Sequence, residues 1–176
     1  ETMVVFTADH GEAFGEHGRW GHHPYMYDEL LRVPLIVDEP GRSPRTDDTQ
    51  VSLLDLFPTI CDACGIERPG KLQGENLHEK ENGVELGTSN GGHRLAARTS
   101  EWKCLWHVED DEVELYDLAA DPGESSDVSG ENPDVVERLK GEMQDYRERA
   151  RSTETDLPEI EESEEVKQRL RDLGYR

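Results

Sequence analysis

Basic residues are scarce in this 176-residue chain, where 19 Lys and Arg stand against 41 Asp and Glu and give a formal net charge of −22. No basic stripe interrupts the acidic sequence, so nucleic acid is excluded as an expected partner. Lysine is especially rare, and the acids are spread along segments that look folded. This pattern favours adaptation to high salt, where screening weakens self-repulsion, over an ordinary acidic soluble protein. Apolar residues make up only 33%, which predicts a modest core in one domain, or in a domain with a tail.

Cysteine and long apolar runs are also in short supply. Three cysteines are an odd number, which argues against a disulfide framework. Cys61 and Cys64 have the spacing of a redox or zinc motif, but they fall within an expected helix and no second pair exists. Together with Cys104 they are interpreted as core thiols of a reducing compartment, which favours a cytoplasmic location. No apolar run approaches the length that spans a membrane, so we expect no membrane segment in this piece.

A short apolar run over residues 3–8 ends in an acid and an imidazole, Asp9 and His10, followed by Gly11. Its β-branched residues predict a buried parallel strand of an α/β sheet. Where such a strand breaks into a glycine turn, Asp9 and His10 can face the same ion. A carboxylate oxygen and an imidazole nitrogen suit Zn²⁺, Ca²⁺, Mg²⁺ or Mn²⁺. The alternative is an ordinary turn acid beside a partly exposed histidine.

Three more histidines follow within thirteen residues of His10 in a loop that contains four glycines. They are His17, His22 and His23. A loop that leaves the carboxyl end of a strand is where α/β folds place their chemistry. The density of imidazoles in this loop therefore strengthens the prediction of a functional site there.

Hydrophobic periodicity divides the rest of the chain into short elements. In the first half we predict a helix or turn at 25–31 that packs Tyr27, Leu30 and Leu31 inward, a second buried strand at 33–37, and a helix at 52–64 that is capped by Asp55 and ended by Gly65. Residues 66–92 are predicted to be mostly loop. In the second half we predict strands at 95–99, 103–107 and 112–116, a helix from Pro133 to about Ala150 with one apolar stripe, and a last helix after the acidic stretch 152–165. The three strands predict an antiparallel meander with one covered and one wet face.

Four ordered motifs resemble the C-terminal half of sulfatases in the alkaline phosphatase superfamily. They are Phe6-Thr7-Ala8-Asp9-His10-Gly11-Glu12 with Gly15-Glu16-His17-Gly18, Tyr27-Asp28-Glu29 with Arg32-Val33-Pro34-Leu35-Ile36, Leu54-Asp55-Leu56-Phe57-Pro58-Thr59 with Gly65-Ile66, and Glu114-Leu115-Tyr116-Asp117-Leu118 with Asp121-Pro122-Gly123-Glu124; the tail Leu170 to Tyr175 is also similar. The resemblance implies an α/β fold, with part of an alkaline-phosphatase-like mixed sheet and a small C-terminal antiparallel sheet with helices. We expect residues 1–92 to belong to the catalytic α/β domain, 93–150 to the small-sheet subdomain, and 151–176 to an acidic linker and terminal helix.

The resemblance also implies roles for the loop residues. Asp9 and His10 match two ligands of the family's divalent metal, with Ca²⁺ expected for a sulfatase and Zn²⁺, Mg²⁺ or Mn²⁺ as alternatives. His22 stands where typical sulfatases have a lysine that touches the sulfate, so we expect it to contact a nonbridging oxygen or protonate the leaving alcohol. His23 is a second catalytic candidate, and His17 either contacts substrate or holds the loop.

The family's nucleophile is missing from this sequence. No Cys or Ser stands in a Cys/Ser-x-Pro-x-Arg setting, and this absence indicates a C-terminal piece of a longer enzyme, inactive without its N-terminal half. The expected function is hydrolysis of small-molecule or glycan sulfate esters. A metal-dependent phosphodiesterase or phosphoethanolamine-type transferase, favoured by His22 in the lysine position, and a non-catalytic acidic remnant domain are the alternatives.

Overall fold

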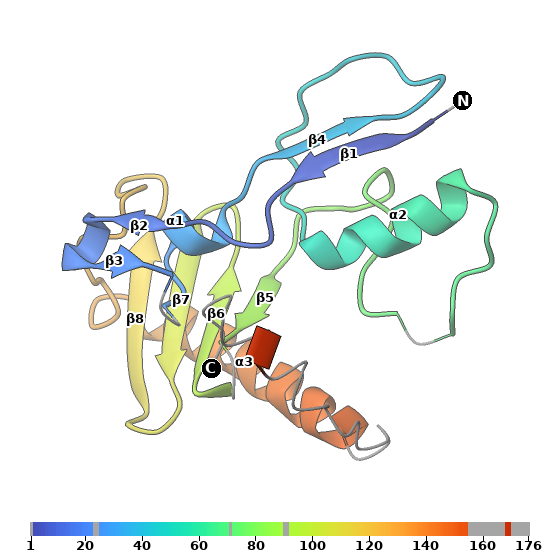
Figure 1. The fold of residues 1–176 in the computed structure, drawn as a ribbon. Helices are drawn as coiled ribbons and strands as arrows, with labels where there is room; N and C mark the ends of the chain where they lie inside the picture. Colours follow the sequence, from blue (N-terminus) through green and yellow to red (C-terminus); the bar gives the residue numbers. More distant parts are fainter. Residues whose placement is uncertain (1, 23–24, 71, 90–91, 155–167, 170–176) are drawn as a thin grey trace. The chain divides into compact units, whose positions relative to one another are not determined.

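The computed structural model describes residues 2–22, 25–70, 72–89, 92–154 and 168–169. The chain divides into two compact units, Glu1–Tyr146 and Arg147–Arg176. All the strands belong to the first unit, and Figure 1 shows them as one four-stranded sheet and two short ribbons. No helix in the described part of the chain is both long enough and apolar enough to cross a membrane.

The four-stranded sheet is antiparallel throughout. Its strands, in spatial order, are β5 (Glu85–Thr88), β6 (Arg94–Arg98), β7 (Trp102–His107) and β8 (Glu112–Asp117). The predicted meander of three strands is confirmed as β6 to β8, in a register that sets Trp106 between Leu95 and Val113. Residues 66–92 are mostly loop, as predicted, but β5 adds an edge strand that was not predicted from the sequence. Its Gly87 packs under Met26, where a Cβ would lie 3.1 Å from the Met26 Cε atom.

Both faces of this sheet are covered, so the expectation of one wet face is wrong. Helix α3 (Pro133–Glu154) lays Leu139 and Met143 against a core formed by one face of the sheet. The predicted apolar stripe of this helix is confirmed in full. Met26 and Tyr27, from the loop segment before the helix at 28–31, pack with the side chains of the opposite face. The sheet therefore fixes the position of the segment that follows the histidine loop.

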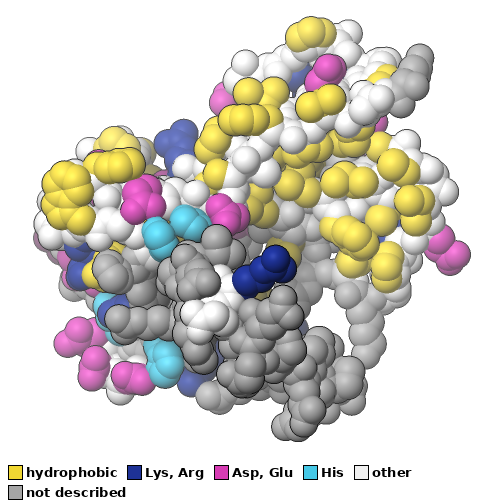
Figure 2. Space-filling model, viewed as in Figure 1, with side chains coloured by type: hydrophobic (Ala, Val, Ile, Leu, Met, Phe, Trp, Pro, Cys, Tyr) yellow, Lys and Arg dark blue, Asp and Glu magenta, His cyan; other side chains and the backbone are white. Residues whose placement is uncertain are grey.

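The first ribbon pairs β1 (Val4–Thr7) with β4 (Leu35–Asp38). The two strands run antiparallel, so the prediction of buried parallel strands is wrong for this pair. Alternate side chains, including Phe6 and Ile36, point outward and are about 60% exposed. Figure 2 shows hydrophobic side chains at the surface over this ribbon and over the neighbouring helix α2.

The expected helix at 52–64 forms as a 3-10 turn, η2 (Leu53–Asp55), followed by α2 (Leu56–Ala63). Its cap is Ser52 rather than Asp55. The Ser52 hydroxyl accepts from the Leu54 N–H, and the Asp55 carboxylate reaches back to the Ser52 N–H in a capping box. The chain leaves the helix at Gly65, whose φ of +65° favours glycine.

The cysteines are free thiols, as expected. Cys61 on α2 and Cys104 on β7 are buried, which confirms them as core residues. Cys64 is exposed at the end of α2, so its assignment to the core is wrong. Burial away from charge raises the pKa of the Cys104 thiol to about 12, which keeps it protonated and inert.

The histidine loop lies between β1 and β4. Its elements are the second ribbon, β2 (Ala13–Phe14) and β3 (Trp20–Gly21), the 3-10 turn η1 (Glu16–Gly18) between them, and the short helix α1 (Asp28–Leu31). Tyr27 and Leu30 are buried as predicted, but Leu31 is partly exposed, contrary to the prediction. The short helix thus anchors the end of the loop through two apolar side chains.

Candidate functional site

Asp9 and His10 follow directly after β1, at a turn held by a glycine. The Gly11 N–H donates to the Leu30 carbonyl at 2.8 Å, which ties the strand end to α1. A Cβ on Gly11 would lie 2.0 Å from the Glu29 carbonyl oxygen. Only glycine fits this close approach of two backbones, so the turn requires the glycine that the sequence supplies.

Asp9 and His10 turn toward each other at this strand end. The Asp9 Oδ2 atom lies 3.9 Å from the His10 Nε2 atom, and Asp9 Oδ1 accepts from the His10 backbone N–H at 3.0 Å. The His10 Nδ1 atom lies 2.8 Å from the Gly11 carbonyl. Because a carbonyl only accepts, Nδ1 carries the proton and Nε2 keeps a lone pair. A carboxylate oxygen and a basic imidazole nitrogen at this separation fit a divalent ion with small adjustments.

The ribbon of β2 and β3 brings a second pair of side chains to the same place. Ala13 pairs with Gly21, so Glu12 and His22 stand opposite each other just beyond this pair. The Glu12 Oε2 atom lies 3.0 Å from His22 Nδ1, and the rings of His10 and His22 are 4.8 Å apart between centroids. His10, Glu12 and His22 each offer a ligand atom within 4.8 Å of the others. Figure 2 shows histidine side chains beside acidic ones on the face that it draws.

Glu12 is not among the site residues that the sequence predicts. The structure brings it into the cluster through the pairing of β2 with β3. Each of these strands has two residues, too short for a periodic signal. Residues two positions apart on a strand lie on the same face. Glu12 is two positions from Phe14, and His22 is two positions from Trp20. This spacing is the only hint in the sequence that Glu12 and His22 share a face of the ribbon.

His17 lies apart from this cluster and is held by protein groups on both ring nitrogens. Its Nδ1 atom is 2.8 Å from a Glu29 carboxylate oxygen, and its Nε2 atom is 2.9 Å from the Glu124 carbonyl. The ring also stacks on Tyr27, with the centroids 3.8 Å apart. This arrangement supports the alternative in which His17 holds the loop. His23, the other catalytic candidate, lies outside the described residues.

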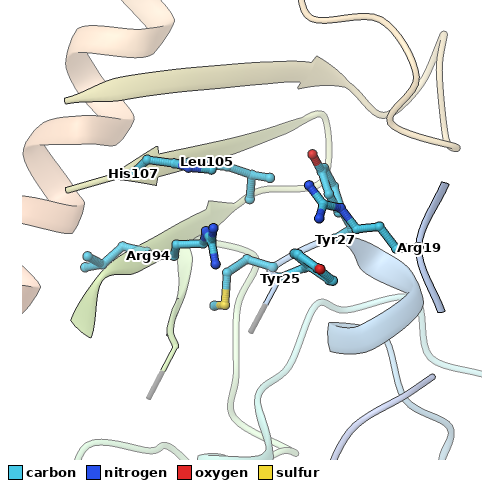
Figure 3. Close-up of a pocket in the computed structure, with 8 residues that line it drawn as sticks. Arg19, Tyr25, Tyr27, Arg94, Leu105 and His107 are labelled. Carbon is cyan, nitrogen blue, oxygen red and sulfur yellow. The ribbon is translucent and has the colours of Figure 1, made fainter. Parts of the chain in front are cut away.

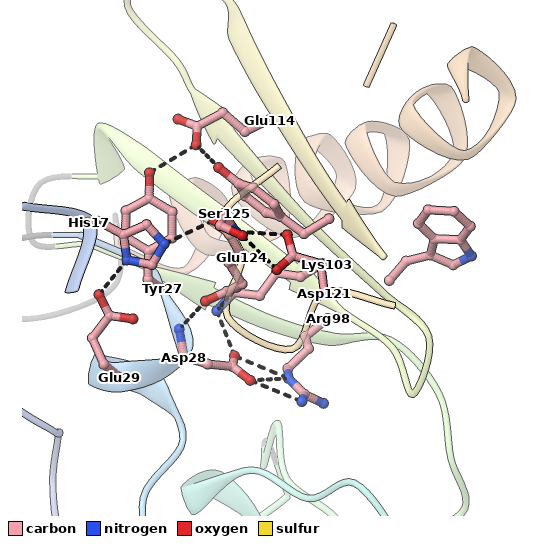
Figure 4. A network of polar contacts seen from close by, with 12 residues as sticks. His17, Tyr27, Asp28, Glu29, Arg98, Lys103, Glu114, Asp121, Glu124 and Ser125 are labelled. Atoms are coloured by element: carbon pink, nitrogen blue, oxygen red, sulfur yellow. Dashed lines mark hydrogen bonds and ion pairs between the residues drawn. The ribbon is translucent and has the colours of Figure 1, made fainter. Parts of the chain in front are cut away.

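A buried ionic network connects the end of the loop to the four-stranded sheet (Figure 4). Lys103 on β7 is fully buried, with its Nζ atom 2.7 Å from Asp28 and 2.9 Å from Glu124. Glu124 also accepts from the Asp28 backbone N–H at 2.6 Å, and Arg98 on β6 donates to the Asp28 carboxylate. Buried charges need such complete pairing, so these residues fix α1 on the sheet.

The network shifts two carboxyl groups in opposite directions. Burial opposes the charge of Asp28, but Lys103 and Arg98 outweigh it and lower the pKa of this carboxyl. Burial raises the pKa of Glu124, and the pull of Lys103 offsets this only in part. The two carboxylates share one lysine, and Asp28 has the arginine as well. Of the two carboxyl groups, Asp28 is therefore the one whose charged form the network favours more strongly.

A separate pocket lies between the loop and the sheet. Figure 3 shows Arg19 beside the Tyr25 ring, with the guanidinium carbon 3.8 Å from the ring centroid, and Arg94 approaching the same ring from 5.8 Å. Leu105 and His107 of β7 close the pocket. Among the described residues, Asp9, His10, His17 and His22 do not line it, so it is distinct from the histidine cluster.

With the geometry in place, the chain can be compared with known proteins. Residues 15–149 match the family model described as "N-sulphoglucosamine sulphohydrolase, C-terminal". The chain belongs to the sulfatase family. The match covers most of the chain, including the histidine loop from Gly15 onward and the four-stranded sheet, and confirms the resemblance drawn from the motifs.

Individual sulfatases resemble the chain over most of its length. It is 33% identical over 164 residues to an uncharacterized sulfatase, YidJ, of Escherichia coli, which covers 85% of this chain and 33% of that protein. The structure of BT1596, a 2-O GAG sulfatase, superposes with a TM-score of 0.74 at 26% identity, over 89% of this chain and 38% of that one. The structure of BT4656, in complex with its substrate D-glucosamine-2-N,6-O-disulfate, has a TM-score of 0.66 at 25% identity, over 89% and 36%.

These likenesses confirm the predicted fold class, an α/β arrangement of the alkaline-phosphatase type with a small antiparallel sheet. Sulfatases of this superfamily are generally metal-dependent. The chain spans about a third of the length of the curated relatives that it matches.

Proposed function

We propose that this chain supplies one side of the active site of a sulfatase-type, metal-dependent hydrolase of sulfate esters. The observation that carries the proposal is made at the end of β1. There a carboxylate oxygen of Asp9 lies 3.9 Å from an imidazole nitrogen of His10. His22 reaches the same place from the β2–β3 ribbon, with its ring 4.8 Å from that of His10. Two strand ends thus meet where the family places its chemistry.

In this proposal Asp9 and His10 hold the divalent ion. Ca²⁺ is the ion we favour for a sulfatase, with Zn²⁺, Mg²⁺ and Mn²⁺ as alternatives, since the donor pair is one oxygen and one nitrogen. A bound ion neutralises charge on the ester group. The Gly11 turn supports both ligands by holding the end of β1 against the carbonyl of Leu30.

His22 is the proposed contact to the ester group. The Glu12 carboxylate lies 3.0 Å from the Nδ1 atom of His22, so a proton on Nδ1 is shared with the carboxylate. The Nε2 atom of His22 stays available for the ester group. That atom can donate to a nonbridging oxygen or to the leaving alcohol when protonated. His23 remains a second candidate for this role. His17, held on both ring nitrogens, supports the loop.

We further propose a sulfated sugar as the substrate class. The support is the BT4656 complex with a disulfated glucosamine, which has the same fold over 89% of this chain.

A phosphodiesterase or phosphoethanolamine-type transferase is the second candidate function, favoured by a histidine in the place of the family's lysine. A non-catalytic acidic domain is the third. The remaining ligands and the nucleophile would come from an N-terminal half of the same enzyme.

The experiment that tests the proposal is Asp9→Asn in the full-length enzyme. We expect bound metal and sulfate-ester hydrolysis to be lost together, measured by elemental analysis and by sulfate release from a sulfated disaccharide. Asp110→Asn, at an exposed acid in the turn between β7 and β8, is the matched control and leaves both unchanged. Full metal content and full activity in the Asp9 variant would end the assignment.

Two properties of the natural setting follow from composition. We infer adaptation to high salt from the net charge of −22, because counterions reduce the repulsion that such a charge creates in the folded state. The unfolding temperature should rise between about 0.1 M and about 2 M KCl, and a flat or falling curve would contradict this.

We also infer a reducing, cytoplasmic compartment from the three thiols, which thiol titration of the protein from its native cells would test.

A further inference from the structure

The cluster of His10, Glu12 and His22 is a different donor set from the Asp9 and His10 pair. It contains two imidazoles and one carboxylate, with ligand atoms within 4.8 Å of one another. We propose that these three side chains bind a borderline divalent ion such as Zn²⁺, which competes with the ion held by Asp9 and His10 because both ions use the lone pair of His10 Nε2. The proposal goes beyond the sulfatase assignment, because it gives Glu12 and His22 a ligand that this assignment does not need.

The hydrogen bonds of the cluster prepare its nitrogen atoms for an ion. The Gly11 carbonyl accepts from His10 Nδ1 at 2.8 Å, so His10 Nε2 has its lone pair free of a proton. A hydrogen bond from the far nitrogen to a carbonyl is the arrangement that orients ligating histidines and raises their basicity. His10 is thus held in the form that binds a metal.

Glu12 and His22 provide the other two ligands. The Glu12 Oε2 atom and the His22 Nδ1 atom are 3.0 Å apart with a proton between them. Two ligands of a tetrahedral zinc ion lie about 3.3 Å apart, given metal–ligand bonds of about 2.0–2.1 Å. An ion can therefore replace that proton with little movement of either atom. Because a neutral imidazole carries a single proton, that proton then sits on the other ring nitrogen of His22, Nε2.

The cluster is open to solvent and flexible enough to close. The side chains of His10, Glu12 and His22 are 42%, 39% and 61% exposed. Their backbones are held by the Gly11 turn and by the pairing of β2 with β3. A shift of about 1.5 Å in the exposed His10 ring brings a separation of 4.8 Å to the distance between two zinc ligands. Two imidazoles favour zinc over Ca²⁺, which prefers oxygen ligands.

The experiment is titration of the 176-residue chain with Zn²⁺ by calorimetry, together with Co²⁺ absorption spectra. We expect one ion per chain and the visible bands of tetrahedral Co²⁺. Glu12→Gln and His22→Ala should each weaken Zn²⁺ binding at least 10-fold, in line with the loss of one ligand. Circular dichroism checks that each variant keeps its fold.

One control variant makes the outcomes distinct. His93→Ala removes an exposed imidazole that lies 2.8 Å from a carboxylate oxygen of Glu109 and should leave Zn²⁺ binding unchanged. The proposal is overturned if the wild-type chain does not bind Zn²⁺, or if Glu12→Gln and His22→Ala bind it normally. Loss of binding in Asp9→Asn alone would overturn it too, while supporting the Asp9 and His10 pair of the proposed function.

Discussion

The His17 Nε2 atom lies 2.9 Å from the Glu124 carbonyl, a contact between residues 107 positions apart. Both residues have a left-handed backbone, with φ of +52° at His17 and +50° at Glu124. Residues other than glycine adopt this backbone conformation at a cost in free energy, so contacts with the surrounding structure must stabilise it. Each of these strained residues is held partly by the other, and His17 also lies 2.8 Å from the carboxylate of Glu29.

Stability should depend on pH through His17. Both of its partners only accept hydrogen bonds, so the doubly protonated ring fits the site best. Burial disfavours that charge, but the hydrogen bonds from His17 to Glu29 and to the Glu124 carbonyl outweigh it and raise the pKa of His17 above its ordinary 6.5. A raised folded pKa stabilises the fold below the unfolded pKa, and this contribution disappears as the pH rises through the folded pKa.

The measurement is urea unfolding of His17→Gln against the wild type. We expect a loss of about 1–3 kcal/mol at about pH 5.5, the range for hydrogen bonds to charged groups, and a smaller loss at about pH 8.5. His93→Gln, in an exposed pair with Glu109, is the control and should change stability by less than about 1 kcal/mol. A loss that grows with pH would contradict the charged state assigned to His17.

The buried Lys103 gives the second prediction. Lys103→Met should destabilise the chain by roughly 3–5 kcal/mol, because Asp28 and Glu124 then keep buried negative charge without their shared lysine. Lys140→Met, whose partner Asp111 is 68% exposed, should cost less than about 1 kcal/mol. Adding Glu124→Gln to the Lys103 variant should restore part of the loss. Equal effects of the two lysine variants in denaturant unfolding would refute the buried network.

The site could be predicted from the sequence only where its signal is local. The strand end at Asp9 and His10 was recognisable because a β-branched run stops at an acid, an imidazole and Gly11, all adjacent. Glu12 was missed because its partner His22 is set by the register of a two-residue ribbon. Lys103 looked like an ordinary strand residue, since its burial depends on Asp28 and on Glu124, which no local pattern connects to it.

The fold shows the same division. The meander of β6 to β8 and helix α3 have clear periodicity, so they were predicted. β5 was missed because the alternation of Val84, Glu85 and Leu86 is only three residues long before Gly87 interrupts it. The direction of pairing between β1 and β4 was wrong, because an apolar strand does not encode which neighbour it pairs with. Contacts distant in sequence decided each of these cases.

A glycine substitution tests how the site is supported. Gly11→Ala places a Cβ 2.0 Å from the Glu29 carbonyl oxygen, so the backbone must shift, at a cost of about 1–3 kcal/mol or more. We expect lower thermal stability and weaker Zn²⁺ binding, because His10 moves with this turn. Gly141→Ala in α3 meets nothing within 4 Å and should stabilise the helix by about 0.5–1 kcal/mol. A neutral Gly11 variant would show that the turn can relax.

The last prediction concerns turnover by the 176-residue chain itself. Its cysteines and serines lack the x-Pro-x-Arg setting of the family's nucleophile, so the residues proposed to hold the ion and to contact the ester have no such group beside them to attack sulfur. We expect no sulfate release from an aryl sulfate or a sulfated disaccharide above the buffer rate, with or without Ca²⁺ or Zn²⁺. The full-length enzyme, assayed in parallel, serves as the positive control. Robust hydrolysis by the chain alone, absent from its Asp9→Asn variant, would mean that a nucleophile lies within these residues and that the family's mechanism does not apply to them.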